Sequence, residues 1–137
     1  MGVVVDKDYT HKLLGCAYAV HSALGPGLME SVYEAALKYE LESQGFTVKQ
    51  QVPVKVKYKG VELDLNLRLD LIVDDRVILE LKSVSELQPV HMKQLLTYMR
   101  LTEIKLGYVI NFNEYSLKDG IERIVNNFNI ETLNDSI

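Results

Sequence analysis

Two short apolar runs joined by a polar turn constrain the fold of this chain more than any other feature. The runs are residues 71–73 (Leu-Ile-Val) and 77–79 (Val-Ile-Leu), and residues 74–76 (Asp-Asp-Arg) lie between them. Short runs rich in β-branched residues and bounded by turn-forming residues are typical of antiparallel strands. The sequence therefore predicts a β-hairpin here, and the register of that hairpin decides where its flanking residues point.

Asp70 and Glu80 flank the two runs. If the loop has three residues, Val73 pairs with Val77, and counting back places Asp70 opposite Glu80 on one face. A two-residue loop would put the two carboxylates on opposite faces. Side chains alternate along a strand, so Lys82 shares a face with Glu80. We predict the three-residue loop, closed at residues 74–76, which brings two carboxylates and one ammonium group within a few ångströms of one another.

This constellation has a catalytic and a structural interpretation. Paired carboxylates repel unless a cation lies between them, and hard oxygen ligands suit Mg²⁺ or Mn²⁺ better than zinc. Lys82 could then orient or deprotonate water and stabilise developing negative charge. Alternatively, Asp70 and Glu80 are solvated residues on an exposed sheet face, with Lys82 in a surface ion pair of little energy. The spacing D-x(9)-E-x-K alone does not decide between the two.

The rest of the chain predicts one mixed α/β domain spanning residues 1–137. Apolar residues recur at helical spacing early in the chain, alternating patterns follow, and a proline opens a later helix. A chain of 137 residues also has the usual length of a single domain. The expected helices are 9–23, 28–44 and 89–101, and the expected strands are 46–52, 54–58, 61–69, 70–73, 77–82 and 107–110.

Charge and hydropathy restrict the possible partners. The 15 Lys and Arg residues are outnumbered by 19 Asp and Glu residues, giving a net charge of −4. Such a chain is not expected to coat nucleic acid by bulk electrostatics, so any polyanion must meet a local patch. The sequence has no secretory signal pattern and no apolar run of membrane-spanning length, which predicts a cytoplasmic protein without membrane association.

A further motif adds a carboxylate at a helix start and carries a family resemblance. Residues 27–33 read Gly27-x-x-Glu30-x-x-Tyr33. Together with Asp70, the Glu80-Leu81-Lys82 triplet, Gln94 and the segment 106–112, this pattern resembles the GxxExxY family, a branch of the PD-(D/E)XK nuclease superfamily, from His21 to Arg123. The resemblance implies a restriction-endonuclease-like core, with a mixed central β-sheet flanked by helices.

The resemblance also implies roles for individual residues. Asp70, Glu80 and the Leu81 backbone carbonyl would bind Mg²⁺, with Mn²⁺ as the alternative ion. Lys82 would be the catalytic lysine, Glu30 would complete the metal shell, and Gln94 would be the polar residue of the following helix. Tyr33, Tyr98 and His21 would contact these groups and hold them in position. Tyr98 lies one helical turn after Gln94.

Several of these residues have structural alternatives. Glu30 stands three residues after Gly27, the capping-box position, where its carboxylate could satisfy a backbone N–H. Tyr33 could be a packing residue with a hydrogen-bonded hydroxyl. His21 and Gln94 could be groups on helix surfaces. These alternatives stay open at the level of sequence.

Lys55, Lys57 and Lys59 alternate with apolar residues and form the densest basic stripe of the chain. On one strand face, they could follow a phosphate backbone. They could equally protect a sheet edge from pairing with another molecule. The sequence therefore favours a Mg²⁺-dependent phosphodiesterase acting on DNA or RNA. The alternative is an inactive module of the same fold that binds nucleic acid or protein, and a homodimer would enlarge its surface.

Overall fold

A computed structural model describes residues 3–126. It contains a central sheet, three α-helices, one 3₁₀ helix and a separate pair of short strands. In chain order these elements are α1 (Lys7–Leu24), α2 (Glu30–Ser43), β1 (Val48–Pro53), β2 (Val56–Tyr58), β3 (Val61–Leu63), β4 (Arg68–Val73), β5 (Val77–Lys82), α3 (Pro89–Thr102), β6 (Leu106–Asn111), η1 (Leu117–Gly120) and β7 (Ile121–Val125).

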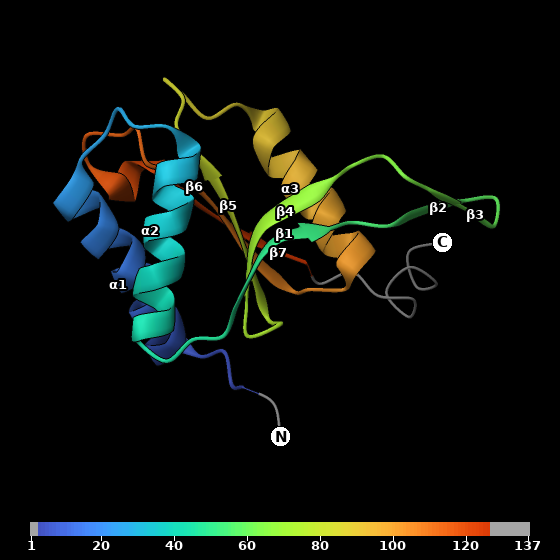
Figure 1. Cartoon of the computed structure of the whole chain (residues 1–137), viewed down its shortest axis with the longest axis horizontal. Helices are drawn as coiled ribbons and strands as arrows, with labels where there is room; N and C mark the ends of the chain where they lie inside the picture. Colours follow the sequence, from blue (N-terminus) through green and yellow to red (C-terminus); the bar gives the residue numbers. More distant parts are fainter. Residues whose placement is uncertain (1–2, 127–137) are drawn as a thin grey trace.

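The central sheet is mixed and has the strand order β1-β4-β5-β6-β7 (Figure 1). β5 and β6 are parallel, and α3 makes the crossover between them, whereas the other neighbours are antiparallel. Parallel strands need such a crossover because a tight turn cannot connect them. The observed architecture confirms the predicted mixed sheet flanked by helices, consistent with a restriction-endonuclease-like fold.

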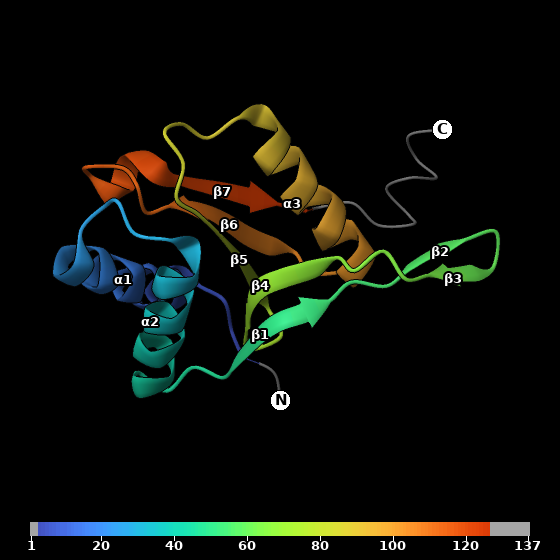
Figure 2. The same cartoon turned by 45° about the horizontal axis from the view of Figure 1, so that its top comes forward.

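The sheet separates two hydrophobic cores. Figure 2 shows α1 and α2 on one face and α3 on the other. One core joins α1 and α2 to Leu71, Leu79 and Ile110, and the other joins α3 to Ile72 and Ile78. Alternation along β4 and β5 produces this division, since neighbouring residues point to opposite faces. Both faces of these strands are covered, which explains why their apolar runs are continuous.

Gly107 allows α3 to pack closely on β6. A Cβ atom at this position would lie 2.9 Å from Met99 Sδ and 3.1 Å from a Leu95 methyl carbon. A larger residue here would force the Met99 and Leu95 side chains to move, because a packed interior has little free space. The glycine thus leaves room for these two side chains between α3 and β6.

The hairpin between β4 and β5 has the three-residue register. Val73 pairs with Val77, Ile72 with Ile78 and Leu71 with Leu79, which confirms that prediction. Asp74 and Asp75 have positive φ angles of 53° and 55°, a region that aspartate tolerates better than most residues.

Contacts from distant segments hold this turn in place. Asp74 Oδ2 accepts a hydrogen bond from the Tyr9 hydroxyl at 2.8 Å, and Asp74 Oδ1 accepts one from Thr47 N at 2.9 Å. The side chain of Asp74 therefore joins α1 and the start of β1 to the tip of the hairpin. Its role is structural.

The single strand expected over 61–69 is wrong, because the chain turns away from the sheet and back. β3 ends at Leu63, β4 begins at Arg68, and Asn66 between them has φ +55°. Val54 N donates to Leu67 O at 2.8 Å where the two chains leave the sheet. β2 and β3 form a two-stranded arm that projects from the body in Figures 1 and 2.

The segment 121–125 was not expected to be a strand, but it forms β7 at the edge of the sheet beside β6. The sequence of this segment shows no regular alternation of buried and exposed residues, since only Ile121 and Ile124 are partly buried. The strand forms because β6 lies beside it. The helices of residues 3–126 include none that is both long and apolar enough to cross a lipid bilayer.

Candidate active site

The β4–β5 pair opens into a fork at Asp70 and Glu80. Ladder pairing stops at Leu71 and Leu79, one residue before the two carboxylates. Beyond this point, Asp70 Oδ2 accepts a hydrogen bond from Leu81 N at 2.8 Å, and Glu80 Oε1 accepts one from Asp70 N at 3.1 Å. Side chains thus replace the backbone ladder, and the two acidic groups are neighbours across the hairpin, as predicted.

Glu80 is the more buried of the two acids, with 9% of its surface exposed. Its pKa is raised from 4.5 to about 8, first because burial removes the solvation of the charged form and next because Asp70 lies nearby. The amide of Asp70 and the charge of Lys82 act in the opposite direction. Without a cation, the site therefore holds a carboxyl group that favours its proton at neutral pH.

Lys82 lies two residues after Glu80 on β5 and is partly buried. Its positive charge lowers the pKa of Glu80, which shows that the ammonium is close enough to act on that carboxyl group. Within the described part of the chain, no carboxylate forms an ion pair with Lys82. Its ammonium group is therefore available to a substrate or to water.

The Leu81 carbonyl faces the same edge of β5 as the Leu81 amide. In an extended strand, the N–H and C=O of one residue point to the same neighbour. Because Leu81 N donates to Asp70 Oδ2, the carbonyl of Leu81 also points into the fork. The Leu81 side chain itself is buried in the core between the sheet and α1 and α2. Leu81 can thus contribute a backbone oxygen beside the two carboxylates.

Tyr98 on α3 approaches the carboxylate pair from the face of the sheet that α3 covers. Burial raises the pKa of its phenol, and the nearby charges of Glu80 and Asp70 raise it further. A hydrogen bond with Gln94, one helical turn earlier, acts in the opposite direction. The structure therefore brings Gln94 and Tyr98 together near the pair, although Gln94 is exposed and Tyr98 is buried.

Glu30, in the first turn of α2, contacts the residue that follows β5. Its Oε1 accepts a hydrogen bond from Ser83 N at 3.3 Å, and Ser83 Oγ donates to Leu28 O at 2.6 Å. The α2 start has no side-chain cap, so the capping-box alternative for Glu30 is wrong. The carboxylate lies beside the residue that follows Lys82.

The Tyr33 hydroxyl holds the loop between α1 and α2 in place. Its hydroxyl donates to Gly25 O and accepts a hydrogen bond from Leu28 N at 3.1 Å. The buried ring stacks on Phe112 with centroids 4.6 Å apart. α2 begins at Glu30, later than expected, because Tyr33 holds the preceding loop in a non-helical conformation. Tyr33 thus positions the loop that carries Glu30, and its hydroxyl bonds are to the backbone.

His21 also bonds to the backbone, where Nε2 donates to Glu114 O at 2.7 Å. Neither His21 nor Tyr33 hydrogen-bonds to Asp70 or Glu80 in the region 3–126. Over the same region, no three His, Cys, Asp or Glu side chains are grouped closely enough to hold a metal ion. The geometry therefore provides a carboxylate pair, with Glu30 at Ser83 and not in a three-acid cluster.

Gln51 and Glu34 adjoin the site, although no sequence pattern identified either residue. Gln51 Nε2 donates to Glu34 Oε1 at 2.7 Å and lies 3.4 Å from Asp70 Oδ1. Gln50 Nε2 donates to the other oxygen of Glu34 at 2.6 Å. Consecutive strand residues normally point to opposite faces, but Gln51 has φ +51° and lies outside the β1–β4 pairs. This irregularity in β1 aims both amides at α2 and one of them at Asp70.

Asn111 is fully buried, and its side chain holds Val84, two residues after Lys82. Its Oδ1 accepts hydrogen bonds from Val84 N at 3.1 Å and Asn113 N at 3.2 Å, and its Nδ2 donates to Val84 O at 2.9 Å. A polar residue at the end of the apolar run 106–110 was the signal in the sequence that could have identified this position.

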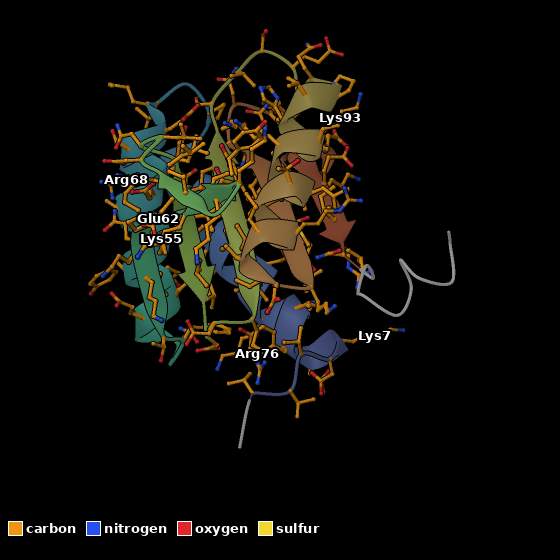
Figure 3. All side chains as sticks on the ribbon, turned by 90° about the vertical axis from the view of Figure 1, so that its right-hand side faces the viewer. Lys7, Lys55, Glu62, Arg68, Arg76 and Lys93 are labelled. Carbon is orange, nitrogen blue, oxygen red and sulfur yellow. The ribbon has the colours of Figure 1, made fainter. Side chains whose placement is uncertain are left out.

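The basic stripe lies at the β2–β3 arm, not on the central sheet, and Figure 3 labels Lys55, its first residue. Lys55 Nζ lies 3.7 Å from Glu62 Oε1, and both side chains are exposed. Lys59 has φ +51° in the turn after β2, so it does not continue the alternation of Lys55 and Lys57. After the arm, the chain re-enters the central sheet at Arg68, the first residue of β4, which lies two residues before Asp70.

A family model described as the PD-(D/E)XK nuclease superfamily matches residues 7–124, nearly the whole chain. The chain belongs to the PD-(D/E)XK nuclease superfamily. The matched range includes the fork, α3 and the α2 start that reaches Ser83. No curated protein and no solved structure matches this PD-(D/E)XK chain. Membership therefore rests on the family pattern, which agrees with the mixed sheet and with the acidic pair on β4 and β5.

Proposed function

We propose that this PD-(D/E)XK protein is a Mg²⁺-dependent phosphodiesterase that hydrolyses DNA or RNA, and that it is a GxxExxY member of the superfamily. The observation that carries the proposal is the reciprocal pairing of Asp70 and Glu80 across a strand fork, with Lys82 beside them. A structural hairpin would gain nothing from placing two acids together in a partly buried position.

The donor groups fit a hard divalent cation. Asp70 and Glu80 offer carboxylate oxygens, and the Leu81 carbonyl points to the same fork. The raised pKa of Glu80 reflects burial and repulsion, both of which a positive ion would offset. A bound Mg²⁺ or Mn²⁺ would polarise a phosphate and lower the pKa of a water molecule. Asp70, Glu80 and Leu81 are therefore the proposed metal ligands.

The remaining groups have roles that follow from their positions. Lys82 donates hydrogen bonds to the attacking water or to a phosphate oxygen, where its charge stabilises the developing negative charge. Gln94 and Tyr98 offer polar groups from α3 near the acidic pair. Glu30 holds the Ser83 amide and can accept a hydrogen bond from water at the end of β5.

The β2–β3 arm is the proposed contact for the nucleic-acid backbone. Lys55, Lys57 and Lys59 gather positive charge on an arm that is connected to β4, the strand that carries Asp70, whereas the whole chain has a net charge of −4. Phosphate contacts of this kind position a substrate without reading its sequence. A strand bound along the arm would be led toward the carboxylate pair.

The test is cleavage of labelled single- and double-stranded DNA and RNA with Mg²⁺, Mn²⁺ or EDTA. We expect metal-dependent cleavage by the parent and at least about a hundredfold loss in Lys82→Ala. Lys93→Ala is the matched control, because Lys93 is an exposed lysine on α3 (Figure 3). No cleavage of any substrate by the parent, or equal cleavage by Lys82→Ala, would contradict the enzyme.

A second candidate is a module that binds nucleic acid without cutting it. The absence of a three-acid cluster within residues 3–126 favours this alternative, because a site with only two carboxylates holds a metal ion less firmly than a site with three. Binding that persists in EDTA and that falls in a Lys55, Lys57 and Lys59 triple alanine variant, without cleavage by the parent, would support it.

A further inference from the structure

A second feature lies at the opposite end of the sheet from Asp70 and Glu80. A cavity of about 680 Å³ lies between the start of α1, the tip of the β4–β5 hairpin and the adjoining ends of β6 and β7. Arg76 at its rim precedes β5, and Lys82 ends β5, so about 20 Å of strand separates the two regions. Figure 3 shows Arg76 with Lys7 at one end and Arg68 with Lys93 toward the other.

Apolar side chains from separate elements form part of the cavity wall. Val5 precedes α1, Ile104 follows α3, and Leu106 and Val125 are paired across β6 and β7. Tyr108 is paired with Arg123 two residues further along the same strands. The volume lies within the range of about 300–1,000 Å³ that small-molecule sites occupy. The cavity can therefore hold the apolar body of a small ligand.

Unpaired positive charge surrounds this apolar wall. Lys7, Arg76 and Arg123 line the cavity, and none has an ion-pair or side-chain hydrogen-bond partner among residues 3–126. Lys105 also lines the cavity but already has a partner of its own, so it is not counted with these three. In a chain with a net charge of −4, this local concentration of positive charge would attract an anion.

Among residues 3–126, no acid of the cavity forms an ion pair with these three cationic side chains. Asp6 Oδ1 caps α1 by accepting a hydrogen bond from Tyr9 N at 2.9 Å. Asp75 Oδ1 forms an ion pair with Lys49 Nζ at 2.7 Å, and Lys49 lies outside the cavity. Glu103 is the remaining acid of the lining. Two of the three carboxylates are thus already engaged, whereas both arginines are not.

We propose that this cavity binds a small organic phosphate of mononucleotide size. Guanidinium groups recognise phosphate through paired hydrogen bonds, and Arg76 and Arg123 both line this cavity without a side-chain partner among residues 3–126. The apolar wall would take the base and sugar. This site is separate from the acidic pair, and the inference does not depend on nuclease activity.

The test is isothermal titration calorimetry on the full chain in EDTA, with adenosine and uridine 5′-monophosphates. EDTA removes divalent ions, so a nucleotide cannot be held at the carboxylate pair through a metal. We expect saturable binding, and affinity at least about tenfold lower for adenosine and for inorganic phosphate. Amide chemical shifts should move at residues 104–108 and 123–125.

Two substitutions and a control assign the binding to the cavity. Arg76→Gln and Arg123→Gln should each weaken nucleotide binding at least about tenfold, and both residues are exposed, so folding should be unaffected. Arg68→Gln removes an exposed arginine at the other end of the sheet and should bind as the parent does. The proposal is overturned if the parent shows no saturable binding, if adenosine or phosphate binds as tightly as the monophosphates, or if the three variants behave alike.

Discussion

Replacing Glu80 by glutamine should stabilise the metal-free protein increasingly as the pH rises. The pKa of Glu80 is raised from 4.5 to about 8 by burial and by Asp70. Between these two values the folded state holds a proton that the unfolded state releases, so the contribution of Glu80 to stability is fully present below pH 4.5 and is lost as the pH rises toward 8. Glutamine resembles the protonated acid but does not titrate.

The size of the effect follows from the shift. One pKa unit corresponds to about 1.4 kcal/mol, so the raised pKa of Glu80 lowers the free energy of unfolding, relative to its value below pH 4.5, by about 3 kcal/mol at pH 7 and by about 5 kcal/mol above pH 8. Glu80→Gln should therefore match the parent near pH 4.5 and exceed its stability by these amounts at higher pH. The glutamine Oε1 can still accept a hydrogen bond from Asp70 N, as Glu80 does.

Urea denaturation followed by far-UV circular dichroism between pH 5 and 9, in EDTA, measures the difference between variant and parent. Glu86→Gln, at an exposed glutamate after β5, is the control and should leave the pH dependence unchanged. Added Mg²⁺ should then stabilise the parent more than Glu80→Gln, because binding to the folded state raises its stability. A difference between Glu80→Gln and the parent that stays constant across this pH range would refute the electrostatic reasoning.

Three further predictions concern the same region. Titration calorimetry with Mn²⁺ should show lost binding in Asp70→Ala, whereas Lys82→Ala should keep or slightly raise affinity because it removes a competing cation; unchanged binding in Asp70→Ala would exclude this metal site. Gln51→Leu should weaken Mn²⁺ binding about three- to tenfold, because the Asp70 carboxylate loses a hydrogen bond that orients it. Gln50→Leu is the control, because Gln50 contacts Glu34 but not Asp70, and equal effects of the two substitutions would reduce Gln51 to a structural residue. Tyr33→Phe should lower the free energy of unfolding by about 1–3 kcal/mol in urea titrations, because it leaves Gly25 O and Leu28 N without this partner; a loss below about 0.5 kcal/mol would contradict the role of its hydroxyl.

The sequence by itself predicted the hairpin register and the pairing of Asp70 with Glu80. Both depend on short-range features: the length of the turn, the continuous apolar runs and strict alternation along each strand. The helices were predicted to within a few residues for the same reason, since helical periodicity is a local property. Gln94 and Tyr98 were correctly placed on one face of α3 by their spacing.

Tertiary structure decided the features that depend on distant contacts. β7 is a strand because β6 lies beside it, and the arm leaves the sheet where Asn66 turns with a positive φ angle. Gln51 reaches Asp70 because an irregular backbone conformation overrides the alternation expected of a strand. The cationic cavity joins α1, the hairpin tip, β6 and β7, segments that are far apart in the sequence, so no local pattern could have predicted it.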